Sequence, residues 1–240
     1  MMKMHTIIST REITDMDLTE DWNFTFRFYT FPLIQKSINY DSLVEDRIFS
    51  LAKENINAFF TSESAVKSVL SRLEQCPTWQ LFALGGKTKE TLLQFFPAVQ
   101  SPRYAKNSTE LAEQVRENRD LFTHQKNVFF CGDKRMPTIP RVFEALNIPL
   151  EEVICYKSTC QPSSISGPIQ GMLFFSPSAV ECFFKHNKSI HEQTVLFAIG
   201  DTTAGAISKY CTNKVVVAPK PSEASLLHEV KKYFEVTTNN

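Results

Sequence analysis

The sequence of 240 residues has only 7 glycines, no net charge and no long hydrophobic run. Its 26 basic residues balance 26 acidic ones, which argues against a protein that binds nucleic acid through a basic surface. No apolar run approaches the roughly 20 residues of a membrane-spanning helix. The first ten residues lack the apolar core of a signal peptide. We therefore expect a globular protein of the cytoplasm, with no nucleic acid and no membrane as partner.

Several motifs of catalysis and cofactor binding are also missing. Gly86-Lys87-Thr88 resembles the end of a phosphate-binding loop, but that loop requires a glycine five residues before Gly86, where this sequence has Leu81. No GxGxxG motif follows a predicted strand, and neither an HExxH motif nor a Gly-x-Ser-x-Gly motif is present. We expect no metal ion and no organic cofactor.

The six cysteines contain no CxxC pair, and several lie inside apolar stretches. We interpret them as reduced residues of the core rather than as metal ligands or disulfide partners. They are Cys76, Cys131, Cys155, Cys160, Cys182 and Cys211.

An internal repeat divides the chain. The segment 60–66 aligns without gaps with 174–180, at an offset of 180 − 66 = 114 residues. A second block aligns 81–88 with 196–203, and a weaker third aligns 111–115 with 226–230, both at an offset of 203 − 88 = 115. Three blocks in the same order at nearly one offset indicate two similar modules.

Each module alternates short apolar runs with helical patterns. The runs 58–60 and 171–175 suit buried parallel strands, and each ends in Ser or Thr, which favours a helix N-cap. The same pattern recurs at Leu81–Leu84 and Val195–Ile199, each followed by a glycine. The alternation predicts an α/β fold with two similar parallel-sheet domains.

The strands at Met4–Ser9 and Val153–Tyr156 have no repeat partner. The simplest arrangement starts one module, leaves it near Pro32, builds the second module and returns near Tyr156. We therefore predict a discontinuous first domain of residues 1–32 and 161–240. The second domain spans 37–152, and linker segments 33–36 and 153–160 connect the two.

Hydroxyl side chains gather where strands are predicted to end. The carboxyl ends of parallel strands meet at one edge of a sheet, together with the free N–H groups of helix N-termini, and such a rim favours anions. Two rims that face each other across a hinge would bind a ligand with several carboxylates, neutralised by Arg11, Lys87, Arg135 and Lys220. In the simpler interpretation the hydroxyl groups only cap helices.

Tyr156 lies where the chain recrosses between the domains. Its hydroxyl is a weak acid that can pass a proton to a leaving group if it points into the cleft. Otherwise Tyr156 is a packing residue.

The ordered set of motifs resembles the uroporphyrinogen-III synthase family from about residue 6 to residue 234. The resemblance rests on Ile8-Ser9-Thr10-Arg11, Phe60-Thr61-Ser62, Val153 to Thr159, Phe174-Phe175-Ser176-Pro177-Ser178, Ile199-Gly200 with Thr202-Thr203-Ala204, and Pro219-Lys220-Pro221-Ser222. It implies two α/β domains joined by a two-stranded β linker. It also implies a lyase without cofactor that closes linear hydroxymethylbilane into a macrocycle with loss of water and inversion of ring D, in heme biosynthesis.

On this interpretation Tyr156 is the catalytic acid. The substrate-binding residues are Arg11, Thr61, Ser62, Lys87, Thr88, Arg135, Ser176, Ser178, Thr202, Thr203, Lys220 and Ser222. We expect a monomer. A transient contact with the preceding enzyme of the pathway is compatible with this expectation.

Two other functions fit the same sequence. A hinged module that binds an acidic small molecule without transforming it predicts saturable binding and no product. A two-domain α/β enzyme that acts on a phosphorylated substrate predicts protection by phosphate against heat.

Overall fold

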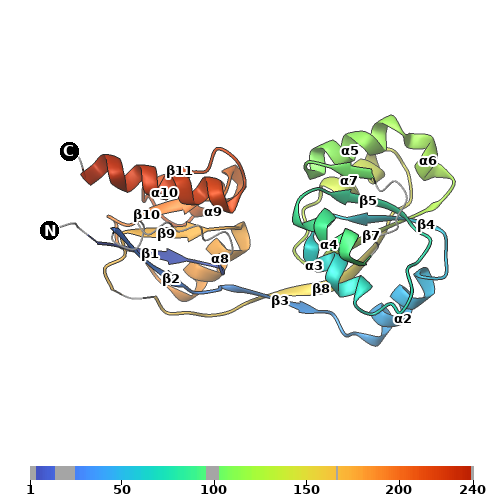
Figure 1. The fold of residues 1–240 in the computed structure, drawn as a ribbon, viewed down its shortest axis with the longest axis horizontal. Helices are drawn as coiled ribbons and strands as arrows, with labels where there is room; N and C mark the ends of the chain where they lie inside the picture. Colours follow the sequence, from blue (N-terminus) through green and yellow to red (C-terminus); the bar gives the residue numbers. More distant parts are fainter. Residues whose placement is uncertain (1–3, 14–24, 96–102, 166, 239–240) are drawn as a thin grey trace. The chain divides into compact units, whose positions relative to one another are not determined.

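The structure is a computed structural model that describes residues 4–13, 25–95, 103–165 and 167–238. By its contacts the chain divides into two compact units, drawn in Figure 1. Unit 1 comprises Met1–Gln35 and Thr159–Asn240, and unit 2 comprises Lys36–Ser158. No helix in the described part of the chain is long and apolar enough to cross a membrane.

Unit 1 contains one sheet whose described strands follow the order β11-β10-β9-β1-β2. Every pair of neighbours in it is parallel. Its strands are β1 (His5–Ser9), β2 (Phe26–Thr30), β9 (Gly171–Phe174), β10 (Val195–Ala198) and β11 (Val215–Val217). Its helices are α8 (Pro177–His186), α9 (Asp201–Ile207) and α10 (Glu223–Thr238).

The two faces of this sheet carry separate cores. Ile8 packs with Met172 and with residues of α8 and α9, whereas Ile7 packs with Leu173 and with residues of α10. Consecutive residues point to opposite faces of a strand, so a strand buried on both sides is mostly apolar. This explains why the repeated runs of the sequence are continuously hydrophobic rather than alternating.

Unit 2 contains a sheet of order β3-β8-β7-β4-β5-β6 among the described residues, with parallel pairs from β8 to β6. Its strands are β3 (Ile34–Ile38), β4 (Ile56–Phe60), β5 (Gln80–Leu84), β6 (Arg103–Ala105), β7 (Lys126–Gly132) and β8 (Glu151–Cys160). Its helices are α2 (Ser42–Leu51), α3 (Glu63–Leu70), α4 (Lys87–Phe95), α5 (Ser108–Glu117), α6 (Arg119–Thr123) and α7 (Thr138–Ala145).

Aromatic residues fill both faces of the unit 2 sheet. Phe60 and Phe130 belong to the core under α2, α3 and α4, and their rings stack at 5.1 Å. Phe59 stacks on Phe82 at 4.8 Å in the opposite core, under α5 and α7. The prediction of an α/β fold with parallel sheets is confirmed.

Strands β3 and β8 both contain a boundary between the units. They are neighbours in the sheet. The N–H of Asn39 donates to the carbonyl of Cys155, and the N–H of Gln161 donates to the carbonyl of Leu33. Residue numbers therefore rise along one strand as they fall along the other, so the pair is antiparallel.

The aligned blocks of the sequence fall on equivalent elements of the two units. In the first block, Ser62 is the N-cap of α3 and Ser176 is the N-cap of α8. Each accepts a hydrogen bond of 3.2 Å from the N–H three residues later. The prediction that these two serines cap helices is confirmed, and their extended backbone angles are nearly the same in the two units.

The interpretation of the cysteines as reduced residues of the core is wrong at three positions. Cys160 and Cys182 form a disulfide that joins the last residue of β8 to α8 within unit 1. The two lie 22 positions apart in the sequence, and the packing of α8 beside the returning strand is what brings them together. Cys131 and Cys155 are buried thiols, as predicted, whereas Cys76 is exposed rather than part of the core.

Candidate active site

A pocket of about 200 Å³ opens at the carboxyl ends of β4 and β7 in unit 2. Thr61 and Ser62 follow β4, Gly132 ends β7, and Thr138 begins α7. Tyr156 of β8 completes the wall, and Lys134 and Arg135 bring positive charge. The pocket thus combines hydroxyl groups, cations and one phenol.

Tyr156 reaches this pocket because β8 is irregular. Cys131 pairs with Ile154, but the next residue of β7, Gly132, pairs with Tyr156, so one residue of β8 is passed over. Such a bulge re-aims the side chains that follow it. Val153 and Cys155 are buried in the core, and Tyr156 is half-buried at its edge.

The Tyr156 hydroxyl makes a directed hydrogen bond with Ser62. The Ser62 hydroxyl accepts from the backbone N–H of Ala65 and donates to the Tyr156 oxygen, at 3.2 Å in both contacts. Burial raises the pKa of the Tyr156 phenol, and the hydrogen bond from Ser62 acts in the opposite direction. The phenol therefore stays protonated at neutral pH.

The cations around this pocket are partly paired. Arg135 holds Glu152 through both Nε and Nη2, and the Nη2–Oε1 distance is 2.8 Å. Lys134 is exposed on the same loop. Lys36 of β3 places its ammonium group 5.7 Å from the centre of the Tyr156 ring. Sequence analysis missed Lys36 and Lys134, because only the pairing of β3 with β8 and the loop after β7 bring them here.

The corresponding edge of unit 1 carries a fixed arginine. Arg11 follows β1, donates to the Glu223 carboxylate at 2.6 Å, and lies 4.0 Å above the centre of the Phe175 ring. The Glu223 side chain is 3% exposed and that of Arg11 is 46% exposed. The buried carboxylate and the ring together orient a guanidinium that remains open to solvent.

The other predicted residues of unit 1 lie at the carboxyl ends of its strands. Ser176 and Ser178 stand at the start of α8 and are half-buried, and Thr202 is exposed in the first turn of α9. Lys220 and Ser222 are exposed before α10, where Ser222 accepts a hydrogen bond from the N–H of Ser225 at 3.2 Å. The structure thus brings these residues and Arg11 to one edge of the unit 1 sheet.

Two predicted contact residues are covered by protein. Thr88 and Thr203, at equivalent places of the second aligned block, are 6% and 1% exposed. Each sits in the first turn of a helix that packs on the sheet, so its side chain offers almost no surface to a ligand. Lys87, next to Thr88, is exposed at the start of α4 and is not among the residues that line the pocket described above.

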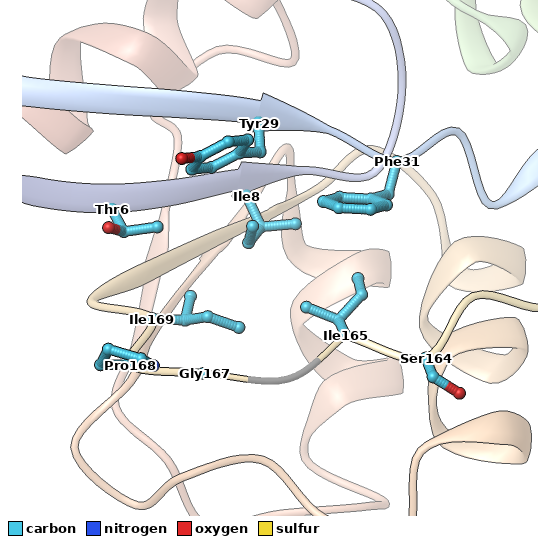
Figure 2. Close-up of a pocket in the computed structure, with 9 residues that line it drawn as sticks. All are labelled: Thr6, Ile8, Tyr29, Phe31, Ser164, Ile165, Gly167, Pro168 and Ile169. Atoms are coloured by element: carbon cyan, nitrogen blue, oxygen red, sulfur yellow. The ribbon is translucent and has the colours of Figure 1, made fainter.

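A larger pocket, of about 400 Å³, lies in unit 1 against β1 and β2. Figure 2 shows Ile8, Ile165 and Ile169 facing the space between these strands and the segment that returns from β8. None of the described residues that line it is charged. A charged ligand would lose its hydration there without a counterion, so this pocket is not suited to a polycarboxylate.

Among the described residues no group of three or more His, Cys, Asp or Glu side chains could hold a metal ion.

Comparison with known proteins places the arrangement in a family. The family model described as uroporphyrinogen-III synthase HemD matches residues 28–228. The chain belongs to the uroporphyrinogen-III synthase family. No curated protein sequence matches it significantly.

Solved structures of uroporphyrinogen-III synthases share the fold. The enzyme from Helicobacter pylori superposes with a TM-score of 0.67 at 16% identity, over 95% of this chain and 99% of that one. A mutant enzyme from the extremely thermophilic bacterium Thermus thermophilus gives 0.64 at 14% identity, over 96% and 99% of the two chains. The fold is therefore retained although few of the residues are.

Proposed function

We propose that this chain closes linear hydroxymethylbilane into uroporphyrinogen III, the reaction of its family, with Tyr156 as the proton donor. The reaction eliminates water, so the enzyme is a lyase. The observation that carries the proposal is the hydrogen bond from Ser62 to Tyr156, at a pocket that also contains cations.

The proton donor in this scheme is the neutral phenol of Tyr156, which lines the pocket and contacts Ser62. The substrate hydroxyl is a poor leaving group until it receives a proton and departs as water. The Tyr156 phenol is protonated at neutral pH because burial raises its pKa further above the usual 10.0, and the hydrogen bond from Ser62 stabilises the phenolate that forms when the proton leaves. Departure of water leaves an azafulvene. Attack through the substituted carbon of ring D then gives a spiro intermediate, which fragments and recloses at the other carbon.

The carboxylates of the substrate need counterions and N–H donors. We propose that Arg11, Lys87, Arg135 and Lys220 supply positive charge to the eight carboxylates of hydroxymethylbilane. Backbone N–H groups at the helix starts, with nearby hydroxyls, would hold the carboxylates in place. These helix starts and hydroxyls are at Thr61, Ser62, Ser176, Ser178, Thr202 and Ser222.

The binding groups act mainly by steering. Hydroxymethylbilane also closes unaided, to the isomer without inversion, so the enzyme must favour one of two closures. A thousandfold preference corresponds to about 4 kcal/mol between the competing transition states. Two or three charge-assisted hydrogen bonds, at roughly 1.5 to 3 kcal/mol each, suffice if they form better in the favoured geometry.

We further propose that units 1 and 2 are the two domains of an internal duplication. The predicted limits are 1–32 with 161–240, and 37–152, with the linkers in between. The shared cap geometry of Ser62 and Ser176 supports the duplication. The presence of a unit boundary inside both β3 and β8 supports a linker of two strands.

The direct test is to incubate the protein with freshly prepared hydroxymethylbilane and to separate isomers I and III by chromatography. We expect isomer III from the wild-type protein. Tyr156→Phe should lower kcat by about 100-fold or more, as loss of a general acid does. Tyr210→Phe is the matched control, because Tyr210 is exposed on unit 1 and stacked on Phe184.

Saturable binding of hydroxymethylbilane without any isomer III would refute the enzymatic function and favour a binding module. Isomer III formed at an unchanged rate by Tyr156→Phe would keep the function and remove tyrosine as the acid.

A further inference from the structure

Gly132 occupies a position where another side chain would displace Tyr156. A Cβ atom built on Gly132 would lie 2.4 Å from Cζ, 2.5 Å from Cε2 and 2.8 Å from the hydroxyl oxygen of Tyr156. Real Cβ atoms do not approach other atoms so closely. The Tyr156 ring therefore lies directly over the backbone of Gly132, in the space that a side chain would fill.

The backbone itself does not require glycine here. Among the described glycines, a positive φ is found at Gly86 and Gly167 and not at Gly132. Any residue could therefore adopt the conformation of this position, and only the missing side chain distinguishes glycine. The constraint is steric, and it comes from one ring.

The ring is confined from several sides. Gly132 and Tyr156 are paired in the ladder between β7 and β8 at the register shift, which brings the ring across β7. The N–H of Asp133 donates to the Tyr156 carbonyl at 3.3 Å, and Ser62 holds the hydroxyl at the far end of the ring. A rigid ring fixed at its backbone and at its hydroxyl tip has little freedom, and part of it lies directly against the backbone of Gly132.

We propose that Gly132 is a positioning residue for the reaction: by leaving its side-chain space to the Tyr156 ring, it places the phenol hydroxyl at Ser62 and toward the pocket. This inference rests on the proposed function of Tyr156. Ring closure depends on where the proton is delivered, and a displacement of about 1 Å at a reacting group can lower the rate about a hundredfold.

The test is Gly132→Ala, measured by kinetics and by NMR of protein with tyrosines labelled at Cζ. The resonance absent from Tyr156→Phe identifies Tyr156. We expect Gly132→Ala to lower kcat about as far as Tyr156→Phe does, with KM changed less than threefold. It should also shift the Tyr156 resonance. Gly132→Ala added to Tyr156→Phe should lower kcat by less than a further twofold. The Tyr156 hydroxyl, through which Gly132 is proposed to act, is already absent from that background.

The matched control is Gly171→Ala in unit 1. A Cβ there would lie 2.8 Å from Ile7 Cδ1 and 3.1 Å from Phe197 Cε2, so it also crowds a core but touches no part of the Tyr156 pocket. We expect a lower Tm with kcat and the Tyr156 resonance unchanged.

If Gly132→Ala folds poorly, thermal stability measured in a second background still tests the proposal. In a Tyr156→Ala background the new methyl has room, so adding Gly132→Ala should leave the Tm of that background unchanged. A wild-type kcat and an unshifted resonance in Gly132→Ala would overturn the positioning role. The positioning role would also be overturned if Gly132→Ala lowered kcat as much in the Tyr156→Phe background as in the wild-type protein. Absence of isomer III from the wild-type protein would instead refute the proposed function, while the NMR and Tm results would still test the placement of the ring.

Discussion

Arg11 combines a structural contact with a proposed role in binding the substrate. Its guanidinium neutralises Glu223, whose carboxylate is buried, and still presents half of its surface to solvent. A buried carboxylate without its partner is destabilising, whereas removing both charges costs much less. The two roles of Arg11 can therefore be separated by experiment.

We expect Arg11→Gln to lower Tm and to raise KM for hydroxymethylbilane about tenfold, the effect of one lost charge-assisted hydrogen bond. The double variant Arg11→Gln with Glu223→Gln should recover most of Tm but not KM. Thermal denaturation and steady-state kinetics of the three proteins provide the comparison. A KM that recovers together with Tm would show that Arg11 acts only on stability.

Residues whose role depends on their immediate neighbours in the sequence could be predicted. Residues that distant contacts bring into place could not. Ser62 and Ser176 were predictable as caps, because a serine between a buried strand and a helical pattern has a specific local role. Glu223 and Gly132 acquire their roles from Arg11 and Tyr156, which are far away in the sequence. The same holds for the disulfide, since cysteine spacing carries no information on which helix packs beside which strand.

Among the elements, the starts of α3 and α8 form a natural matched pair. Both are capped by serine in the same geometry, and only Ser62 also donates to Tyr156. Ser62→Ala and Ser176→Ala should each lower the free energy of unfolding by about 1 kcal/mol through the lost cap.

Only Ser62→Ala should in addition raise the pKa of Tyr156, because it removes a hydrogen bond that favours the ionised form of the phenol. An NMR titration of the labelled tyrosine measures this directly. Equal Tyr156 pKa values in the two variants would show that the contact with Ser62 is too weak to matter.

The central strands with apolar runs were the easiest elements to predict, and the edge strands the hardest. β4 and β9 are buried along their whole length, and their apolar runs at 58–60 and 172–174 signal a central strand. β2 lies at the edge of its sheet and is mostly exposed, and β6 has three residues. Edge strands face solvent and carry a mixed pattern, so periodicity alone does not reveal them.

For the whole molecule, the two buried thiols of unit 2 predict a loss of stability in alkali. Burial raises the pKa of Cys131 and of Cys155 to about 12 from the usual 9.0. The folded state therefore binds these protons more tightly than the unfolded state. Stability is fully present below pH 9 and falls as the pH rises toward 12, with a slope that approaches about 1.4 kcal/mol per pH unit for each thiol.

Urea denaturation in the presence of a thiol reductant, at about pH 8, 9 and 10, measures this slope. Cys131→Ala should make it shallower. Cys76→Ala is the control and should not, because Cys76 is exposed. A slope unaffected by Cys131→Ala would mean that other groups govern alkaline unfolding.

The pairing of β1 with β9 also sets an order of assembly during synthesis. β1 leaves the ribosome well before β9, so Ile7 has no central neighbour until Gly171 has been synthesised. All of Lys36–Ser158 emerges during that interval and can fold as one continuous piece. The nascent chain thus completes unit 2 before unit 1, and until then β1 is an exposed apolar strand that a chaperone could cover.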